Sequence, residues 1–204
     1  MLIFLVRHGQ SEGNVDGPLM GSTDPPLTPQ GLWQAELAGR RLKELGVRAL
    51  FCGPLRRNIE TAVRIGKVSG LKPVLLPLLF EVSCNQDVYE RSEVASYFPD
   101  VDLSVQMPAV KRDAPETWDM GRQRARYIVQ CLRTQYEATD TNVALITHGN
   151  ISQLLIEAIL GIPPIRAAWL CSGNCSFHLL YAAPDQALVC RLNDESHIPE
   201  QDRS

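Results

Sequence analysis

Short apolar runs alternate with segments of helical periodicity along most of this chain. The runs cover residues 2–6, 47–52, 74–76, 142–147, 176–181 and 188–192. Their length and flanking Gly and Pro residues indicate buried β-strands. The helical segments cover residues 28–45, 55–68, 117–137 and 151–160. This alternation predicts an α/β fold, a three-layer sandwich in which helices flank a mostly parallel central sheet.

The length of the chain fits one folded unit. A chain of 204 residues can bury a sizeable core without staples, so we expect a single domain over residues 1–204. The pattern is poor between Glu81 and Pro115, where several prolines interrupt the chain. Within this stretch, at about residues 82–114, we expect a small insertion that caps the site. A short helix near Ser92–Tyr97 is expected inside it.

Composition and charge exclude several classes of partner. The formal net charge is −3, so no large basic field favours nucleic acid or an anionic membrane, and any anion site is local. The longest apolar run falls far short of the ~20 residues that cross a bilayer, and no basic segment precedes the first strand. We therefore expect a cytoplasmic protein with no membrane partner. The six cysteines are scattered and lack zinc-site spacing, so we expect reduced thiols and no metal.

Two of the buried runs end in the same chemistry. The first continues into Arg7-His8-Gly9, and the run at 142–147 continues into His148-Gly149. If these strands are parallel neighbours, both histidines lie at the sheet edge where open α/β folds bind ligands. Arg56 and Arg57 follow the second strand and would lie at that edge too. Arginine forks and helix N-termini suit phosphate oxygens, so the set predicts a phosphate pocket. The alternative is that these polar residues only mark where each strand meets water.

A phosphate next to a neutral histidine can be transferred to it. Imidazole is a competent nucleophile when neutral, and its ordinary pKa near ~6.5 leaves much of it neutral at physiological pH. The alcohol that leaves then needs a proton. Glu81 follows the third strand and is the candidate general acid, provided that partial burial raises its pKa. The alternative is a solvated loop carboxylate.

Together, and in this order, these motifs resemble the histidine phosphatase superfamily, also called the phosphoglycerate mutase-like family, over nearly the whole chain. Leu5-Val6-Arg7-His8-Gly9 resembles the family signature, which implies that His8 is the nucleophile that becomes phosphorylated. The resemblance implies that phosphate is bound by Arg7, Asn14, Arg57, His148, Gly149 and Asn150. It implies that His148 also stabilises the transition state, and that Glu81 protonates the leaving group and then activates water. No metal or cofactor is implied.

The chain departs from the family pattern at places that concern the substrate. Gly53 stands where many relatives have serine, which removes a hydroxyl near the phosphate arginine. Residues Val82–Asp87 differ from the Phe-Gly-x-Trp-like sequence of relatives, in a loop that lines the substrate pocket. Primer-dependent mutases carry a basic run after the acid glutamate, whereas Tyr89–Glu93 is not clearly basic. These differences favour hydrolysis over transfer to glycerate.

The sequence therefore predicts a metal-independent phosphomonoesterase that acts on a small phosphorylated metabolite through a phosphohistidine. Sugar phosphates, nucleotides, a ribazole phosphate and phosphoserine all remain open as substrates. One alternative is a phosphoglycerate mutase, and another is a phosphate-binding regulator with weak catalysis. The oligomeric state is open, with a homodimer as one option.

Overall fold

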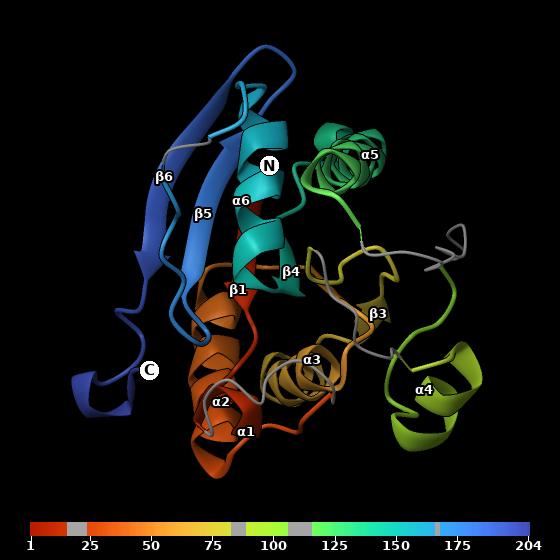
Figure 1. Cartoon of the computed structure of the whole chain (residues 1–204), viewed down its shortest axis with the longest axis vertical. Helices are drawn as coiled ribbons and strands as arrows, with labels where there is room; N and C mark the ends of the chain where they lie inside the picture. Colours follow the sequence, from red (N-terminus) through yellow and green to blue (C-terminus); the bar gives the residue numbers. More distant parts are fainter. Residues whose placement is uncertain (16–23, 83–88, 106–115, 166–167) are drawn as a thin grey trace.

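The computed structural model describes residues 1–15, 24–82, 89–105, 116–165 and 168–204. These residues form a six-stranded sheet in the order β3-β2-β4-β1-β5-β6 (Figure 1). The strands are β1 (Leu2–Arg7), β2 (Ala49–Cys52), β3 (Pro73–Leu75), β4 (Val143–Thr147), β5 (Phe177–Ala182) and β6 (Ala187–Asp194). Strands β3, β2, β4 and β1 are parallel, and β5 and β6 form an antiparallel hairpin beside β1. The predicted mostly parallel sheet is confirmed.

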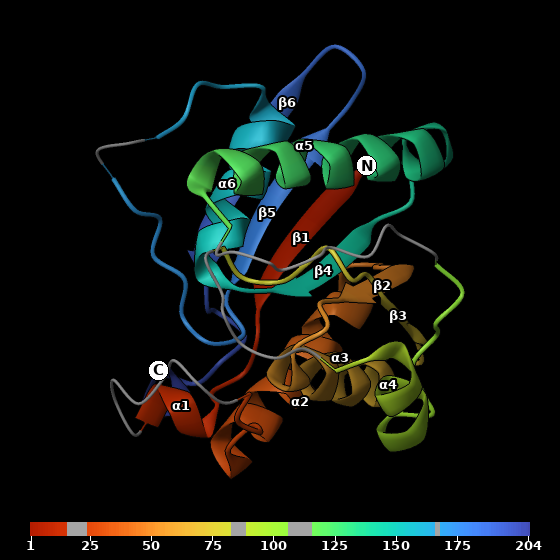
Figure 2. The same ribbon diagram turned by 45° about the vertical axis from the view of Figure 1, so that its right-hand side comes forward.

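Helices cover both faces of the sheet, as Figures 1 and 2 show. The helices α2 (Pro29–Glu44) and α3 (Arg56–Ser69) lie on one face, and α5 (Trp118–Tyr136) and α6 (Gly149–Leu160) lie on the other. Successive side chains of β1 alternate between the two layers, as expected for a strand that is buried on both sides. Phe4 and Val6 join the core next to α2 and α3, and Ile3 and Leu5 join the core next to α5 and α6. The three-layer α/β class is therefore confirmed.

Local sequence signals set the helix ends. Thr28 caps α2, because its hydroxyl oxygen accepts a hydrogen bond from the Gly31 N–H at 3.0 Å. Gly70 ends α3 with a φ of 81°, a left-handed conformation that costs glycine little. Further short helices are α1 (Glu12–Val15), α4 (Arg91–Tyr97), η1 (Glu137–Thr139) and η2 (Glu200–Asp202).

The helix α1 lies in a stretch for which only loop was expected. Its turn is closed reciprocally, because the Ser11 N–H donates to Asn14 Oδ1 and the Asn14 N–H donates to the Ser11 carbonyl oxygen. Residues 16–23 of this stretch lie outside the described residues. Local side-chain hydrogen bonds of this kind form a turn without hydrophobic periodicity, so the periodicity argument did not find it.

The expected insertion is described in part. It contains α4 (Arg91–Tyr97), close to the predicted helix, with Val94 buried in the core on the α3 side of the sheet. Asp102 lies beside β3, since its N–H donates to the Pro73 carbonyl at 2.7 Å and its carbonyl accepts from the Leu75 N–H at 2.9 Å. Residues 83–88 and 106–115 lie outside the described residues, so the capping role of the insertion stays a prediction.

Two further features of the described part of the chain bear on the expectations. None of its helices combines the length and the apolar character needed to cross a membrane. Its cysteines are free thiols: Cys52, Cys131, Cys171, Cys175 and Cys190. Cys84 lies outside the described residues.

Candidate active site

The two predicted histidines lie side by side where β1 and β4 end. These parallel strands stay in register to their last residues, which pairs Arg7 with Thr147. The His8 N–H donates to the Thr147 carbonyl at 2.9 Å. As a result the ring centroids of His8 and His148 are 5.1 Å apart, and both side chains are buried.

The ring of His8 is held in one tautomer. Its Nδ1 lies 2.8 Å from the carbonyl oxygen of Gly9. A carbonyl oxygen only accepts hydrogen bonds, so Nδ1 carries the proton and Nε2 keeps its lone pair. The flanking backbone is also held, since the Gly9 N–H donates to Thr61 Oγ1 at 3.0 Å and Asn174 Nδ2 donates to the His8 carbonyl at 3.0 Å. His8 therefore has the protonation and the rigidity that a nucleophile needs.

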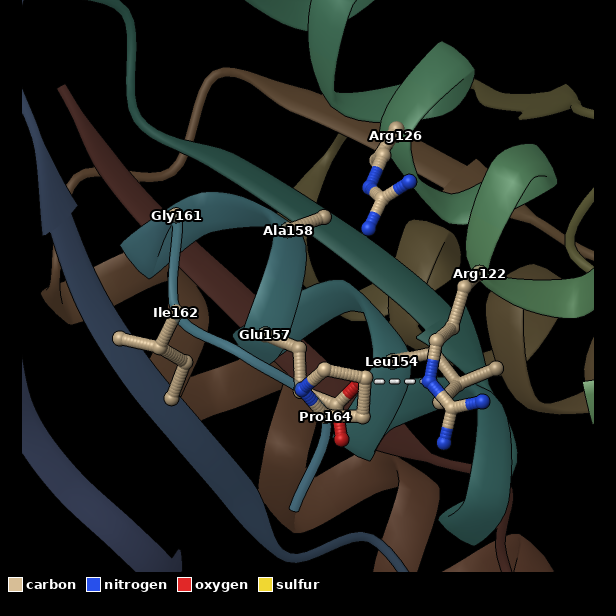
Figure 3. A pocket seen from close by; sticks show the side chains of 8 residues that line it. All are labelled: Arg122, Arg126, Leu154, Glu157, Ala158, Gly161, Ile162 and Pro164. Carbon is tan, nitrogen blue, oxygen red and sulfur yellow. Dashed lines mark hydrogen bonds and ion pairs between the residues drawn. The ribbon is translucent and has the colours of Figure 1, made fainter. Parts of the chain in front are cut away.

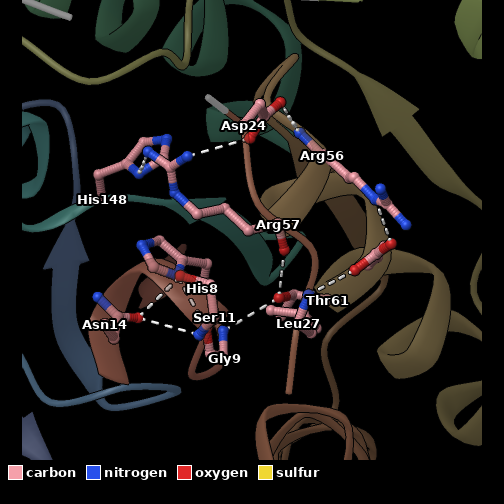
Figure 4. Close-up of polar contacts among 11 residues, drawn as sticks. His8, Gly9, Ser11, Asn14, Asp24, Leu27, Arg56, Arg57, Thr61 and His148 are labelled. Atoms are coloured by element: carbon pink, nitrogen blue, oxygen red, sulfur yellow. Dashed lines mark hydrogen bonds and ion pairs between the residues drawn. The ribbon is translucent and has the colours of Figure 1, made fainter. Parts of the chain in front are cut away.

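Arg57 links His148 to an acidic partner that was not predicted, Asp24. Figure 4 shows its guanidinium between the imidazole and the carboxylate. Its Nη1 lies 3.1 Å from Asp24 Oδ1, and its Nη2 lies 3.5 Å from His148 Nδ1. The other oxygen of Asp24 accepts the backbone N–H of Arg56. The carboxylate thus bridges the first turn of α3 and the arginine side chain that extends from it.

The contact with Arg57 also sets the tautomer of His148. Arginine only donates, so Nδ1 of His148 accepts and its Nε2 carries the proton. Among the described residues, this buried Nε2 atom has no hydrogen-bond partner. A buried donor without an acceptor is costly. The site therefore offers an N–H, next to His8, that suits an anionic oxygen.

Burial and positive charge keep both imidazoles neutral. Burial lowers the pKa of His8 well below the ordinary histidine value, and the charges of Arg57 and Arg7 lower it further. Burial and the Arg57 charge likewise lower the pKa of His148. Burial also lowers the pKa of Arg7. Because the ordinary pKa of arginine is very high, this guanidinium nevertheless stays charged. Two cations beside neutral rings suit a phosphate dianion.

Glu81 lies at the first turn of α6. Its Oε1 accepts the Val82 and Ile151 N–H groups at 2.8 and 2.9 Å, and its Oε2 accepts the Asn150 N–H at 3.2 Å. Burial raises the pKa of this carboxyl, although these hydrogen bonds and the Arg57 charge oppose the rise. Glu81 therefore meets the condition set for a general acid rather than that of a solvated loop carboxylate.

The contact with Glu81 changes the picture for Asn150. Asn150 is a predicted phosphate ligand, but its backbone N–H donates to the Glu81 carboxylate in the structure. A helix N-terminus attracts any nearby anion, and here that anion is a side chain. The side chain of Asn150 remains a predicted phosphate ligand. Gly149, the first residue of α6, remains one as well.

Two more predicted phosphate ligands are oriented by neighbours. The Oδ1 atom of Asn14 accepts from the Ser11 N–H at 3.0 Å and from Asn174 Nδ2 at 3.2 Å. This leaves the amide Nδ2 of Asn14 as the end that can donate to a ligand. Arg7 Nη1 donates to the Ser172 carbonyl at 2.6 Å, which ties this arginine to the segment before β5.

Sequence reasoning missed the residues that support the site from outside. Arg124 of α5 is buried, and its Nη1 donates to the Leu78 and Phe80 carbonyls at 2.5 and 3.0 Å. It therefore holds the segment that leads into Glu81. Its sequence signal was a charged residue on the apolar face of a predicted helix. Asn174 carried no sequence signal for a place at this site, because its contacts lie far away along the chain.

Comparisons with known proteins agree on one family. The histidine phosphatase superfamily (branch 1) matches residues 3–195. A probable phosphoglycerate mutase GpmB from Yersinia enterocolitica is 28% identical over 180 residues, which cover 85% of this chain and 81% of that protein. The protein of the same name from Photorhabdus laumondii is 30% identical over 179 residues, again covering 85% and 81%.

Solved structures share the fold. The ecdysone phosphate phosphatase from Bombix mori, in complex with tungstate, has a TM-score of 0.77 at 18% identity and covers 95% of this chain and 94% of that chain. A mycobacterial glucosyl-3-phosphoglycerate phosphatase, in complex with VO3, has a TM-score of 0.69 at 21% identity and covers 95% and 99%. With a family match over nearly its whole length, the chain belongs to the histidine phosphatase superfamily (branch 1).

Proposed function

We propose that this protein is a metal-independent phosphomonoesterase that acts through a phosphohistidine on His8. The observation that carries the proposal is the pair of complementary tautomers. His8 keeps a lone pair on Nε2 because its Nδ1–H is held by Gly9, and His148 offers an Nε2–H because its Nδ1 accepts from Arg57. One ring can attack phosphorus while the other binds a phosphoryl oxygen.

The first step transfers the phosphoryl group to the protein. His8 Nε2 forms a bond to phosphorus while the bond from phosphorus to the ester oxygen breaks. Arg7, Arg57 and His148 stabilise the charge on the phosphoryl oxygens, a task that metal ions perform in other enzymes. Glu81, whose pKa is raised by burial, gives its proton to the departing oxygen, and a neutral alcohol leaves.

The second step returns the enzyme to its starting state. Glu81, now a carboxylate, takes a proton from a water molecule that attacks the phosphohistidine. The bond between nitrogen and phosphorus breaks, inorganic phosphate leaves, and His8 Nε2 recovers its lone pair. The same carboxyl therefore acts first as general acid and then as general base. A small phosphorylated metabolite is the substrate class that this cycle serves.

The closing test of this proposal is hydrolysis of 4-nitrophenyl phosphate in EDTA. We expect wild-type turnover to survive the chelator and the His8→Ala variant to lose roughly 10³-fold or more in kcat, because the covalent route is gone. His197→Gln is the matched control, since His197 stacks on Phe177 and contacts the Cys175 carbonyl. It should stay within about threefold of wild type. A fully active His8→Ala enzyme would rule out a phosphohistidine mechanism on His8.

A phosphoglycerate mutase is the second candidate, because relatives at 28% and 30% identity are named as probable enzymes of that kind. It would use the same phosphohistidine and return the phosphoryl group to a glycerate hydroxyl instead of water. An assay with phosphoglycerate as substrate and a bisphosphoglycerate primer distinguishes the mutase from the phosphatase. Interconversion faster than phosphate release would favour the mutase, and phosphate release alone would favour the phosphatase.

A further inference from the structure

A recess of about 450 Å³ lies between α5, α6 and the segment that follows α6. It is lined by Thr117, Trp118, Asp119, Arg122, Gln153, Ile165 and Trp169. None of these residues has a part in the phosphoryl chemistry described above. The volume falls within the range of roughly 300–1,000 Å³ that is typical of small-molecule sites.

Two of its walls lead directly to catalytic groups. Gln153 lies one turn along α6 from Asn150, whose N–H holds Glu81, and one turn rises only ~5.4 Å. On the opposite side, Trp169 precedes Ser172, whose carbonyl accepts from Arg7 Nη1 at 2.6 Å. Three residues of extended chain span at most roughly 10 Å. The walls of the recess are therefore joined, over a few residues of α6 and of the segment before β5, to the groups that hold Glu81 and Arg7.

The outer wall is firmly attached to α6. Gln153 is buried, and its Nε2 donates to the Ile165 carbonyl at 3.2 Å while its Oε1 accepts the Leu170 N–H at 3.1 Å. Glu157, also buried, accepts the Ile165 N–H at 2.8 Å. It pairs with Arg122 at 3.2 Å, as Figure 3 shows in a view of a different pocket that shares Arg122 with the recess. Ile165 and Leu170 are thus held to α6 without a ligand, which lowers the entropy cost of binding at these two positions.

Two indole rings face this recess. The ring centroids of Trp118 and Trp169 are 5.0 Å apart, and the planes are tilted by 54°. Trp169 remains 65% exposed, which is unusual for a residue whose large apolar surface favours burial. Asp119 and Arg122 add an ion pair of 2.9 Å at the polar side. A largely exposed indole beside polar groups suits a flat ring that carries hydrogen-bonding atoms.

We propose that this recess binds the leaving group of the substrate and selects phosphate esters whose alcohol carries a flat aromatic or heteroaromatic ring. The ring would stack on Trp169, with Trp118 behind it. This inference rests on the proposed function, because it assigns the recess to the alcohol that departs from the phosphohistidine. It adds a substrate class that the phosphate site by itself does not define.

The test compares two alkyl esters that differ in ring planarity, naphthylmethyl phosphate and cyclohexylmethyl phosphate. Both release a primary alcohol, so the leaving-group chemistry is closely matched. We expect Trp169→Ala to lower kcat/KM for the naphthylmethyl ester about tenfold, in line with base–aromatic stacking energies, and to change the cyclohexylmethyl ester less than about twofold. Trp169→Phe should restore most of the loss. Tyr127→Ala, an exposed aromatic of α5 outside the recess, is the control and should behave as wild type.

Equal losses for both esters, or none for either, would overturn the proposal. A wild-type enzyme that hydrolyses neither ester would instead count against the proposed function, and binding then decides the matter. Isothermal titration calorimetry with the non-hydrolysable naphthylmethylphosphonate should show about tenfold weaker binding to Trp169→Ala than to wild type. Unchanged or absent binding would overturn the assignment of the recess.

Discussion

At the scale of single residues, Arg57 has structural contacts in addition to the phosphate contact predicted for it. Its guanidinium pairs with Asp24 and donates to His148, so it sets the tautomer of one ring while its charge lowers the pKa of the other. Only a planar fork reaches both partners from one side chain, because a lysine ammonium is a single point charge. The burial of Asp24 raises the pKa of its carboxyl, and the Arg57 charge opposes that rise.

We therefore predict that Arg57→Lys lowers kcat/KM for an alkyl phosphate by about 10²-fold, the cost of losing one preorganised donor. Arg56→Lys is the matched control one residue away. Arg56 pairs through its side chain with Glu60 at the protein surface, and such pairs contribute little, so its change should stay within about twofold. Steady-state kinetics of both variants checks the prediction, and similar losses in the two would contradict it.

The pH profile follows from opposite shifts of two groups. His8 must be neutral, and its lowered pKa keeps it neutral below pH 6.5, so the acid limb lies on the acidic side of the ordinary histidine value. Glu81 must be protonated for the first step, and its raised pKa keeps it protonated above the ordinary glutamate value. We predict that kcat/KM falls as pH rises through the pKa of Glu81.

Glu81→Gln isolates that limb. It should lower turnover of an alkyl phosphate by roughly 10²-fold or more, and lower turnover of 4-nitrophenyl phosphate much less, since that alcohol leaves without a proton. The basic limb with the alkyl phosphate should also flatten in the variant, because the acid that causes it is gone. An unchanged basic limb in pH–rate profiles of the variant would show that another group controls it.

At the scale of elements, the loop after β2 and the segment that bears Glu81 touch through their backbones. A Cβ on Gly53 would lie 2.2 Å from the Leu79 carbonyl oxygen, a distance that real structures do not contain. The same carbonyl accepts a hydrogen bond from Thr147 Oγ1 at 3.3 Å. The glycine that departs from the family pattern therefore permits a close approach that places Glu81, in addition to removing a hydroxyl.

We predict that Gly53→Ala lowers kcat at least tenfold, because the segment from Leu79 to Glu81 has to shift. It should also lower the free energy of unfolding by roughly 1–3 kcal/mol, as overpacking does. Gly70→Ala is the control for stability alone, since Gly70 ends α3 with a φ of 81° and nothing lies within 4 Å of its added Cβ. Urea unfolding and kcat measured together separate the effects, and a normal kcat in Gly53→Ala would refute this account.

At the scale of the whole molecule, hydrophobic periodicity predicted the strands and helices, but it could not predict the polar contacts between residues far apart in the sequence. Each strand and long helix lies within a few residues of its expected range, because burial imposes periods of 2 and 3.6 on the sequence. The pairing of Asp24 with Arg57 has no local signature, since the two residues are 33 positions apart in the chain. Asn150 shows the same limit, because a helix N-terminus accepts whichever anion the fold brings to it.

Asn174 shows how distant parts of the chain meet behind His8, the proposed nucleophile. Its Nδ2 donates to the His8 carbonyl at 3.0 Å and to Asn14 Oδ1 at 3.2 Å, while its Oδ1 accepts from Ser204 Oγ at 3.1 Å. The hydroxyl of Ser204 also accepts from Gln34 Nε2 of α2 at 3.0 Å. One amide thus joins the end of β1, α1 and the final segment of the chain, and it contacts both the proposed nucleophile and a predicted phosphate ligand.

We predict that Asn174→Ala lowers kcat about tenfold, because small displacements of a nucleophile carry large rate costs. The matched control is Asn142→Ala at the opposite end of the sheet, where Asn142 Oδ1 accepts from the Leu2 N–H at 3.2 Å and its Nδ2 donates to the Leu45 carbonyl at 3.3 Å. Both variants should lose about 1 kcal/mol of stability per hydrogen bond removed, and only Asn174→Ala should lose rate. Equal kcat values in the two, measured alongside thermal unfolding, would show that Asn174 supports the fold without positioning His8.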